Sequence, residues 1–360
     1  MKLQFKYQKF QADAAQSVVE VFAGQSSAVQ NYFIDSGMNK SRQSEFLVEN
    51  YLGAANSKIT LRDEEILENL QKVQRKNNLV QSEKLEKTDG GINLTIEMET
   101  GVGKTYTYIK TMYELNRNFG WSKFIIVVPS IAIREGVYKT FQVTESHFAE
   151  EYGKKIKFFI YNSAQLTEIE HFAEDKEINA MIINSQAFNS RSETSRRIRM
   201  ELDEFRSRRP IDVIAKTNPI LIIDEPQSVE GAKTKESLRE FKPILTLRYS
   251  ATHREFYNLI YRLDAIDAYN KKLVKEINVT GIKTSGTTAS SGYIYLEKLN
   301  FAPNKPPTAT IHFDCKTKSG IRKKIQTVSQ DFNIYEHSGE LDEYKNNFIV
   351  KFIDGRDNSL

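Results

Sequence analysis

The stretch INLTIEMETGVGKTYTY, residues 92–108, decides the fold class of this chain. Its apolar start predicts a buried β-strand over 92–98, and TYTYIKTMYELNRN predicts a helix over 105–118. Between them, ETGVGKT places two glycines ahead of a Lys-Thr pair. A strand that passes through a glycine-rich loop into a helix is the setting in which such a loop binds phosphate. Met98 stands where the usual loop has its first glycine, five residues before the last one.

The residues of this loop predict a nucleotide site. Gly101 and Gly103 allow a tight turn in which successive N–H groups point at one spot, and the helix N-terminus adds partial positive charge there. Lys104 can reach the β- and γ-phosphates, and the Thr105 hydroxyl can bind Mg²⁺. A glycine turn beside a chance Lys-Thr pair is the alternative, and the flanking strand and helix argue against it. We therefore predict that ATP is held by Thr100, Gly101, Val102, Gly103, Lys104 and Thr105.

Outward from this loop, short apolar strands alternate with helices. Nearly continuous apolar strands in such a series indicate an α/β fold, here a parallel sheet with helices on both faces. We assign this domain to residues 1–275, with 25–90 as a peripheral insertion. Helices are predicted at 11–23, 105–118 and 133–142. Strands are predicted at 92–98, 123–129, 155–161, 178–184, 219–224 and 244–251, the last of which closes the series.

Residues 276–360 differ in sequence pattern, with strand-like runs separated by turns, and predict a smaller β-rich module that follows the sheet. Turn-forming segments such as APNKPP separate its strand-like runs. The role of this module stays open between a DNA- or partner-binding barrel and an inert insertion. The runs lie at 272–282, 292–301, 308–316, 324–335 and 347–355.

An acidic pair supplies the second half of the predicted nucleotide site. In PILIIDEPQ, Asp224 follows a buried apolar strand and should emerge at the carboxyl edge of the sheet, beside the phosphate loop. There it can hold Mg²⁺, and Glu225 is placed to orient or deprotonate the water that attacks the γ-phosphate. Alone, an Asp-Glu pair after a strand is commonly a solvated strand end. The phosphate loop 120 residues earlier, counted from Lys104 to Asp224, makes the pair specific.

Amino-acid composition indicates a globular protein and excludes several other classes. With 39% hydrophobic and 27% charged residues, the 360-residue chain reads as globular, and no apolar run approaches the length that spans a bilayer. The first residues lack the apolar core of a signal peptide, so a cytoplasmic location is expected. Cys315 is the single cysteine and the five histidines are scattered, which excludes a disulfide framework and a Cys-based zinc site. The net charge of +4 permits nucleic-acid binding only through a local basic surface.

The order of motifs resembles the first motor domain of a superfamily 2 helicase, and this resemblance implies that the parallel sheet is RecA-like. Gln11, GVGKT, VVPS, DEPQ and SAT occur in the expected sequence. The strings METGVGKTYTY, IIVVPSIAIREGV, LIIDEPQSVEG, LRYSATHR and YRLDAIDAYNKKLVKEI are similar to the restriction (Res) subunit of Type III restriction–modification enzymes. In that family DEPQ is the typical acidic motif and Met before Glu-Thr-Gly is usual. Met98 therefore fits a family variant of the phosphate loop.

This resemblance implies roles for residues outside the loop. It implies that Gln11 contacts adenine, where an ordinary surface glutamine would otherwise be the better interpretation. It places Pro129, Ser130 and Arg134 along the DNA-backbone path. Ser250 and Thr252 fall in the motif that couples the acidic pair to the state of the γ-phosphate, although Ser and Thr at strand ends are often only caps.

The resemblance also implies an activity and partners. The family couples ATP hydrolysis to translocation or switching on double-stranded DNA, and works with a methyltransferase-specificity (Mod) subunit and a nuclease domain. This chain has no second β/α series after residue 275 and no Pro-Asp nuclease dipeptide, so we expect it to be the amino-terminal portion of a longer protein. The alternatives are another superfamily 2 motor and a non-enzymatic, nucleotide-dependent binding module.

An arginine-rich stretch, residues 191–210, is a further candidate DNA contact. It holds seven arginines against four acidic residues. Arginine clusters bind phosphates and make binding salt-dependent. The more ordinary interpretation is a solvated helix with internal ion pairs, such as Arg197 with Glu201. The backbone around Pro129 and Ser130 is the stronger DNA candidate, because helix N-termini bind phosphates.

Overall fold

The computed structural model describes residues 5–27, 31–35, 51–88, 91–189, 197–229, 231–274, 292–302, 305–317, 319–345 and 348–353. The chain divides into two compact units, residues 1–276 and 277–360, and each is described by itself. Within the described residues, no helix is long and apolar enough to cross a membrane.

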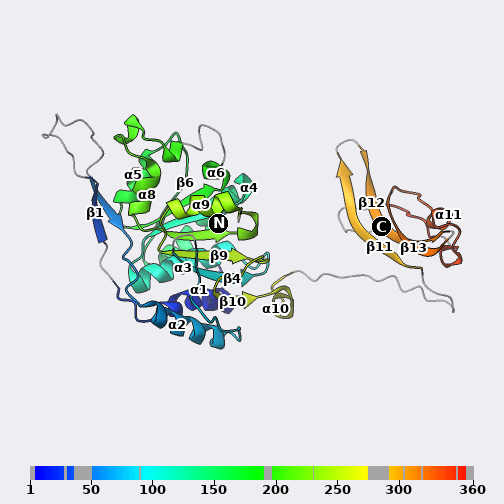
Figure 1. The fold of residues 1–360 in the computed structure, drawn as a ribbon, viewed down its shortest axis with the longest axis horizontal. Coiled ribbons are helices and arrows are strands. Elements are labelled where there is room, and N and C mark those ends of the chain that lie inside the picture. The colour runs from blue at the N-terminus through cyan, green and yellow to red at the C-terminus, as the bar shows by residue number, and fades with distance from the viewer. Residues whose placement is uncertain are drawn as a thin grey trace. The chain divides into compact units, whose positions relative to one another are not determined.

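An eight-stranded sheet forms the centre of the first unit (Figure 1). Seven strands lie in the order β10-β4-β9-β8-β5-β7-β6 and are all parallel, while the short β3 pairs antiparallel with β4. This confirms the predicted α/β fold class with a parallel sheet. The strands are β3 (Lys87–Thr88), β4 (Gly91–Met98), β5 (Lys123–Val128), β6 (Ile156–Ile160), β7 (Ile178–Asn184), β8 (Ile220–Asp224), β9 (Leu245–Ser250) and β10 (Leu259–Leu263).

The prediction that residues 244–251 close the series is wrong. After β9 the chain crosses the end of β4 and adds β10 on the other side, with Leu263 opposite Met98. Only eight residues, 251–258, join β9 to β10, and they contain no helix. The pattern of alternating strands and helices therefore gave no signal for this strand.

Helices cover both faces of the sheet because both faces of its strands are apolar. Along β5, Phe124 and Ile126 pack into one buried cluster, and Ile125 and Val127 pack into another. The first cluster includes residues of α1 (Lys9–Val21), α2 (Asp63–Lys76), α3 (Lys104–Phe119), α4 (Ile131–Tyr152) and α10 (Ala265–Asn270). The second includes residues of α5 (Thr167–Glu174), α6 (Gln186–Asn189), α8 (Pro210–Lys216) and α9 (Ala232–Glu240).

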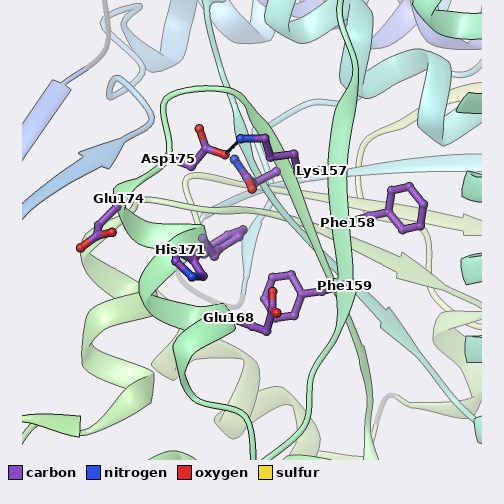
Figure 2. A pocket seen from close by; sticks show the side chains of 9 residues that line it. Lys157, Phe158, Phe159, Glu168, His171, Glu174 and Asp175 are labelled. Atoms are coloured by element: carbon purple, nitrogen blue, oxygen red, sulfur yellow. Dashed lines mark ion pairs between the residues drawn. The ribbon is translucent and has the colours of Figure 1, made fainter.

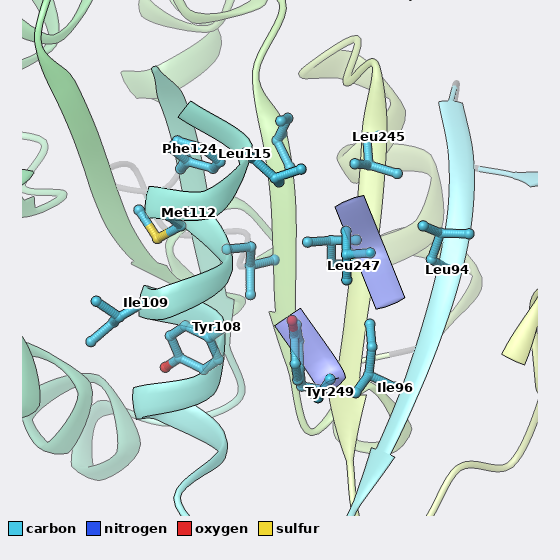
Figure 3. Close-up of a cluster of buried hydrophobic side chains, with 14 of the residues drawn as sticks. Leu94, Ile96, Tyr108, Ile109, Met112, Leu115, Phe124, Leu245, Leu247 and Tyr249 are labelled. Atoms are coloured by element: carbon cyan, nitrogen blue, oxygen red, sulfur yellow. The ribbon is translucent and has the colours of Figure 1, made fainter. Parts of the chain in front are cut away.

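Helix α3 lies on β4 and β9 and fixes the direction in which the phosphate loop leaves the sheet. Figure 3 shows Tyr108 of α3 and Tyr249 of β9 among the buried side chains of this core. Tyr108 and Tyr249 are fully buried, and their rings meet edge to face with centroids 5.6 Å apart. Aromatic pairs of this geometry add stability beyond the apolar area they bury.

Residues 51–88 fall within the predicted peripheral insertion, and in the structure they pack on the sheet domain. Ile66, Leu70 and Val73 of α2 are buried in the first cluster. The Asn56 side chain donates to the carbonyl of Lys123 and accepts from its backbone N–H, at the start of β5. Strands β1 (Asn31–Asp35) and β2 (Tyr51–Ala55) form a separate antiparallel pair.

The second unit is a three-stranded antiparallel sheet with one covered face. Strands β11 (Ile294–Ala302), β12 (Lys305–Thr317) and β13 (Gly320–Val328) pair in chain order. The segment after β13, with the short helix α11 (Ile334–His337), closes a small core over them. The strand predicted over 324–335 is wrong beyond Val328. Of the strand predicted over 347–355, the described residues 348–353 form one bridge, Asn333 to Ile349, and residues 347, 354 and 355 lie outside the described residues. Residues 275–282 of the first predicted run lie outside the described residues.

Candidate nucleotide site

Three neighbouring strands bring the candidate nucleotide site together. β9 lies between β4 and β8, so the carboxyl ends of these strands share one edge of the sheet. β4 leads into the phosphate loop, β8 ends at Asp224, and β9 ends at Ser250. Polar groups that are 120 or more residues apart in the sequence therefore meet at one place, as ligand sites of parallel sheets commonly do.

The phosphate loop has the backbone conformation that only its glycines adopt without strain. Gly101 has φ of +82° and Gly103 has φ of +89°, both in the left-handed region. A Cβ on Gly103 would lie 2.7 Å from the Gln11 side-chain nitrogen, whereas one on Gly101 would point into open space. The open side at Gly101 and the start of α3 directly after Gly103 leave room for a phosphate against backbone N–H groups.

Gln11 of α1 lies against this loop. Its Nε2 donates to the carbonyl of Val102 over 2.9 Å, and the residue is 8% exposed. The hydrogen bond connects the first described helix to the loop across 91 residues of sequence. The structure places the Gln11 side chain at the loop, and its role as an adenine contact stays a prediction.

Lys104 and Glu225 form an ion pair at the sheet edge. The Lys104 Nζ lies 2.8 Å from Glu225 Oε1, and the two side chains are 10% and 24% exposed. Glu225 also accepts hydrogen bonds of 2.7 Å from the Ser250 hydroxyl and the Gln227 amide. Burial alone would raise the Glu225 pKa, but these hydrogen bonds, led by that of Lys104, hold it below its ordinary value. Glu225 is therefore ionised.

Asp224, the neighbouring carboxyl group, has a different environment. It is 5% exposed, and Tyr108 Oη donates to its Oδ2 over 3.4 Å. Burial, and then the charge of Glu225, raise the pKa of Asp224 to about 6, against the opposing effect of Lys104. Burial and the charge of Asp224 together raise the pKa of Tyr108 well above its ordinary value. The phenol therefore keeps its proton and can donate a hydrogen bond to the carboxylate.

Ser250 and Thr252, the residues predicted to couple the acidic pair to the γ-phosphate, occupy different positions in this network. Ser250 is buried at the end of β9, and its hydroxyl contacts both Glu225 and Gln227. Thr252 contacts the residues that bind Glu225. Its N–H donates to Ser250 Oγ over 3.0 Å, and its hydroxyl accepts from the Gln227 amide over 3.4 Å. Gln227 and Tyr108 are contacts that sequence reasoning did not predict. Their parts in the site depend on the strand order, which no local pattern shows.

The predicted DNA contacts lie on a different strand. Pro129 and Ser130 follow β5, which β8 and β9 separate from β4. The Ser130 hydroxyl accepts from the N–H of Ile133 over 3.3 Å and caps α4. Arg134, one turn into α4, pairs with Glu135 at 2.8 Å. This is the helix N-terminus that the sequence favoured for a phosphate contact, and its DNA-binding role stays a prediction.

In the arginine-rich stretch, the described arginines bind acids of the same unit. No helix of the kind considered for 191–210 forms over the described part, where short 3₁₀ turns span Arg197–Arg199 and Asp203–Phe205. Arg197 pairs with Glu204, and Arg199 with Glu240 at 2.8 Å. Arg208 pairs with Glu170 at 2.5 Å and Arg209 with Asp212 at 2.6 Å. Residues 190–196 lie outside the described residues.

A separate hollow of about 460 Å³ lies between β6 and α5 (Figure 2). The Lys157–Asp175 ion pair, at 2.6 Å, closes one side of it, and His171 and Glu168 line another. None of the residues predicted for the nucleotide site lines this hollow. Near it, the buried Lys123 donates to the carbonyls of Phe172 and Asp175, and burial lowers its pKa to about 7.

The donor set at the sheet edge suits a magnesium nucleotide. The Thr105 hydroxyl and the Asp224 carboxylate are hard oxygen ligands of the kind Mg²⁺ prefers. Among the described residues there is no cluster of three or more His, Cys, Asp or Glu side chains that would hold a metal by itself. Mg²⁺ is usually bound by one or two side chains together with substrate phosphates, so this sparse set fits it.

Comparison with known proteins identifies the first unit. Residues 5–255 match the family model described as Type III restriction enzyme, res subunit. The Res subunit of EcoP15I from Escherichia coli is 35% identical over 243 residues, covering 62% of this chain and 25% of the relative. The Res subunit of EcoPI from Escherichia phage P1 is 34% identical over 242 residues, with the same coverage. The chain thus spans about a quarter of the length of these curated relatives.

Two solved structures show weaker similarity. The SWI2/SNF2 ATPase core of Sulfolobus solfataricus in complex with dsDNA has a TM-score of 0.30 and 15% identity, over 55% of this chain and 33% of that one. A nuclease-deletion mutant of the Type ISP restriction-modification enzyme LlaGI, with a DNA substrate mimic, has a TM-score of 0.33 and 13% identity, over 59% and 21%. At these TM-scores the fold assignment rests on the strand order described above.

Proposed function

The chain belongs to the family of Type III restriction enzyme res subunits, and from that premise we propose that its first unit is an ATP-binding and ATP-hydrolysing motor domain. The observation that carries this proposal is the convergence of Lys104, Asp224, Glu225 and Ser250 at the edge of three adjacent strands. Each residue type there has a defined task in phosphoryl transfer.

The ion pair between Lys104 and Glu225 supports an exchange of partners, in which Lys104 leaves Glu225 for the phosphates when a nucleotide binds. The Lys104 ammonium is drawn to the β- and γ-phosphates, which carry more negative charge than one carboxylate. Glu225 then loses its lysine partner but keeps the hydrogen bonds of Ser250 and Gln227. A carboxylate held in this way can orient the attacking water and accept its proton. Ser250 and Thr252 would thereby connect the state of Glu225 to the loop that follows β9.

Asp224 and Thr105 are the residues that would hold Mg²⁺. The chemistry that Mg²⁺ would supply when bound is positive charge that offsets the negative charge of the phosphates. Tyr108 contributes by holding the Asp224 carboxylate in place through its hydroxyl group. Gln11 and the loop residues Thr100, Gly101, Val102 and Gly103 would complete the contacts to adenine and phosphate.

The activity of the whole protein is proposed from the family. We infer that ATP turnover in this domain drives translocation or switching on double-stranded DNA, ahead of cleavage by a nuclease domain. The partner would be a methyltransferase-specificity (Mod) subunit, and Pro129, Ser130 and Arg134 would follow the DNA backbone. A bacterial cytoplasm is the compartment in which such an enzyme acts.

Nucleotide binding by Lys104→Ala is the first test. We expect the affinity of the 360-residue chain for a fluorescent ATP analogue with Mg²⁺ to fall at least about ten-fold, because the phosphate-binding ammonium is lost. Lys139→Ala, which removes an exposed lysine of α4, is the matched control and should bind as the unchanged chain does. Equal affinity in the Lys104→Ala variant would overturn the proposal.

A partner-binding assay separates the motor from a mere binding module. If the domain only docks a partner, Lys104→Ala should still form the complex with a Mod subunit and retain all activity of that complex. The motor proposal instead requires loss of every ATP-dependent activity with the complex still assembled.

A further inference from the structure

The sheet of the second unit has two faces of different character. One face is covered: Ile311 and Phe313 of β12 are fully buried in a core with Ile334, Leu341 and Tyr344 of the following segment. The side chains that alternate with these along the strands project from the opposite face, because successive residues of a strand point to opposite sides. We call the second surface, defined by Tyr293, Tyr295, Lys298, His312, Lys323 and Ile325, the open face.

A row of ring and apolar side chains crosses the open face. Tyr295, His312 and Ile325 are direct partners across β11, β12 and β13. Tyr295 is 52% exposed and Ile325 is 60% exposed, and the rings of Tyr295 and His312 meet edge to face at 5.3 Å. His312 Nε2 also lies 3.0 Å from Glu297 Oε2. Large exposed rings in a row on a sheet mark a binding surface more often than isolated ones do.

Lysines lie beside these rings. The Lys323 Nζ sits over the ring of Tyr293, 4.0 Å from its centroid. Lys323 is the direct cross-strand partner of Asp314, and Lys298, on the opposite edge strand, is exposed. The open face therefore combines flat aromatic surfaces with ammonium groups that project alongside them.

Charge in this unit is divided between the sheet and the segment that covers it. Residues 292–328, which form the sheet, hold seven basic and two acidic side chains, a local excess of five positive charges. Residues 329–353, which cover the other face, hold two basic and five acidic side chains, an excess of three negative charges. This count takes both faces of the sheet together; on the open face, Lys298 and Lys323 lie with the two acids, Glu297 beside His312 and Asp314 beside Lys323. The excess of positive charge over the strands as a whole favours a polyanionic partner.

We propose that the open face of β11, β12 and β13 binds single-stranded nucleic acid. Unpaired bases stack on aromatic side chains, and lysines beside them contact the phosphates. A duplex would leave the exposed ring of Tyr295 without a stacked base, because the bases of a duplex are already stacked and paired. This inference concerns a second site and does not depend on the motor proposed for the first unit.

Anisotropy with a labelled single strand of about twelve nucleotides, a length within the range of one such sheet, tests the proposal on the 360-residue chain without nucleotide. Tyr295→Ala should raise Kd about ten-fold through the loss of one stacked base. Lys323→Ala should raise Kd about three-fold and lower the dependence of log Kd on log salt by about one phosphate contact. Tyr295→Phe, which keeps the ring, should bind within about two-fold of the unchanged chain.

The control is Tyr269→Ala in α10, which removes a 50% exposed tyrosine from the first unit and should leave Kd unchanged. The assay contains no ATP and no Mg²⁺, so a failure of the motor proposal is read separately. The proposal is overturned if the chain shows no saturable binding, or if Tyr295→Ala binds as well as Tyr295→Phe. It is overturned equally if a duplex of the same sequence competes as well as the single strand, which would indicate charge attraction alone. If Tyr295→Ala instead weakens assembly with another protein, the open face is a protein-docking surface.

Discussion

Asp224 and Glu225 are adjacent in the sequence, yet their surroundings shift their pKa values in opposite directions. Burial dominates at Asp224 and raises its pKa to about 6, whereas hydrogen bonds from Lys104, Ser250 and Gln227 lower that of Glu225. Titratable neighbours with divergent pKa values are typical of reaction sites, where the two groups perform different tasks. Here the ionised Glu225 suits a base, and Asp224 is a carboxylate that gains from a bound cation.

Asp224→Asn should stabilise the chain while it abolishes magnesium-nucleotide binding. A carboxyl whose pKa rises from 3.8 to about 6 on folding costs stability as pH rises from 4 to 6, and the full cost persists above pH 6. Asparagine removes a cost on the order of 2–3 kcal/mol at pH 7.5 and almost none at pH 4. Urea denaturation of both chains at these two pH values measures the difference. A loss of stability at pH 7.5 would contradict the assignment of a destabilising, functional carboxylate.

Tyr108→Phe should weaken the response to Mg²⁺ through Asp224. The change removes the hydroxyl that donates to Asp224 over 3.4 Å and leaves the ring packed in the core. We expect the Mg²⁺ concentration for half-maximal nucleotide binding to rise about three- to ten-fold, equivalent to about 1 kcal/mol for a lost hydrogen bond. The measurement is a Mg²⁺ titration of fluorescent-nucleotide binding.

Tyr249→Phe is the matched control for that prediction. Tyr249 is also fully buried and touches the Tyr108 ring, but its hydroxyl bonds to Thr111 over 3.0 Å and not to a carboxylate. The two variants should lose similar stability, and only Tyr108→Phe should shift the Mg²⁺ titration. A purely structural role for Tyr108 would show the same titration in both variants.

At the scale of elements, a buried lysine of β5 contacts the C-terminal end of helix α5. Lys123, at the first position of β5, donates to the carbonyls of Phe172 and Asp175 at the end of that helix. Helix C-terminal carbonyls lack partners within the helix, so a cation there satisfies them. Burial nonetheless lowers the Lys123 pKa to about 7, because the ammonium has left water.

The contribution of Lys123 to stability should depend on pH in a defined window. Its pKa falls from 10.5 in the unfolded chain to about 7 in the folded one, so between these values the unfolded state binds more protons. The free energy of unfolding should therefore rise with pH from 7 to 10, by an amount on the order of 3 kcal/mol, relative to Lys123→Met. Denaturant titrations of both chains across this range give the difference. Parallel pH profiles would contradict the lowered pKa, whatever the absolute stability of the variant.

The elements that sequence predicted are those with a strong local pattern. β5, β7 and β8 are nearly continuous apolar runs, and β4 and β9 alternate apolar with polar residues, so all five stand out without any knowledge of their neighbours. β10 was missed because it follows β9 after a connection that contains no helix. Arg262 is tolerated there because it pairs with Glu97 of β4 at 2.7 Å, a contact visible only once the strands are aligned.

The same distinction applies to the site. The phosphate loop and the acidic pair were predicted because glycine spacing and a strand-ending Asp-Glu are local signals. Tyr108 and Gln227 were not, because each looks like an ordinary residue until β9 is placed between β4 and β8. The acidic partners of the arginine-rich stretch were not predicted either. Its acidic partners Glu170 and Glu240 lie outside the stretch, so a local charge count overstated the free positive charge.

At the scale of the whole molecule, the two units differ in how much hydrophobic core their described residues form. The large sheet is covered on both faces by helices, whereas the second unit buries one face of a three-stranded sheet under a short segment. A small core supplies less stabilisation per residue than a large one. The second unit should therefore be the less stable of the two, and its unfolding should be separable from that of the first.

Calorimetry of the 360-residue chain should consequently show two transitions that respond to different substitutions. Phe313→Ala removes a fully buried ring from the small core, which costs about 3–5 kcal/mol, and should lower or abolish the transition at lower temperature only. Leu247→Ala, at a fully buried position of β9, should cost about 2–5 kcal/mol and move only the other transition. The reason is that the two residues belong to clusters with no common member, so neither cavity loosens the packing of the other core. If both substitutions shift one shared transition, the units fold as a single cooperative domain, and binding defects caused by changes on the open face would have to be tested for effects on the nucleotide site.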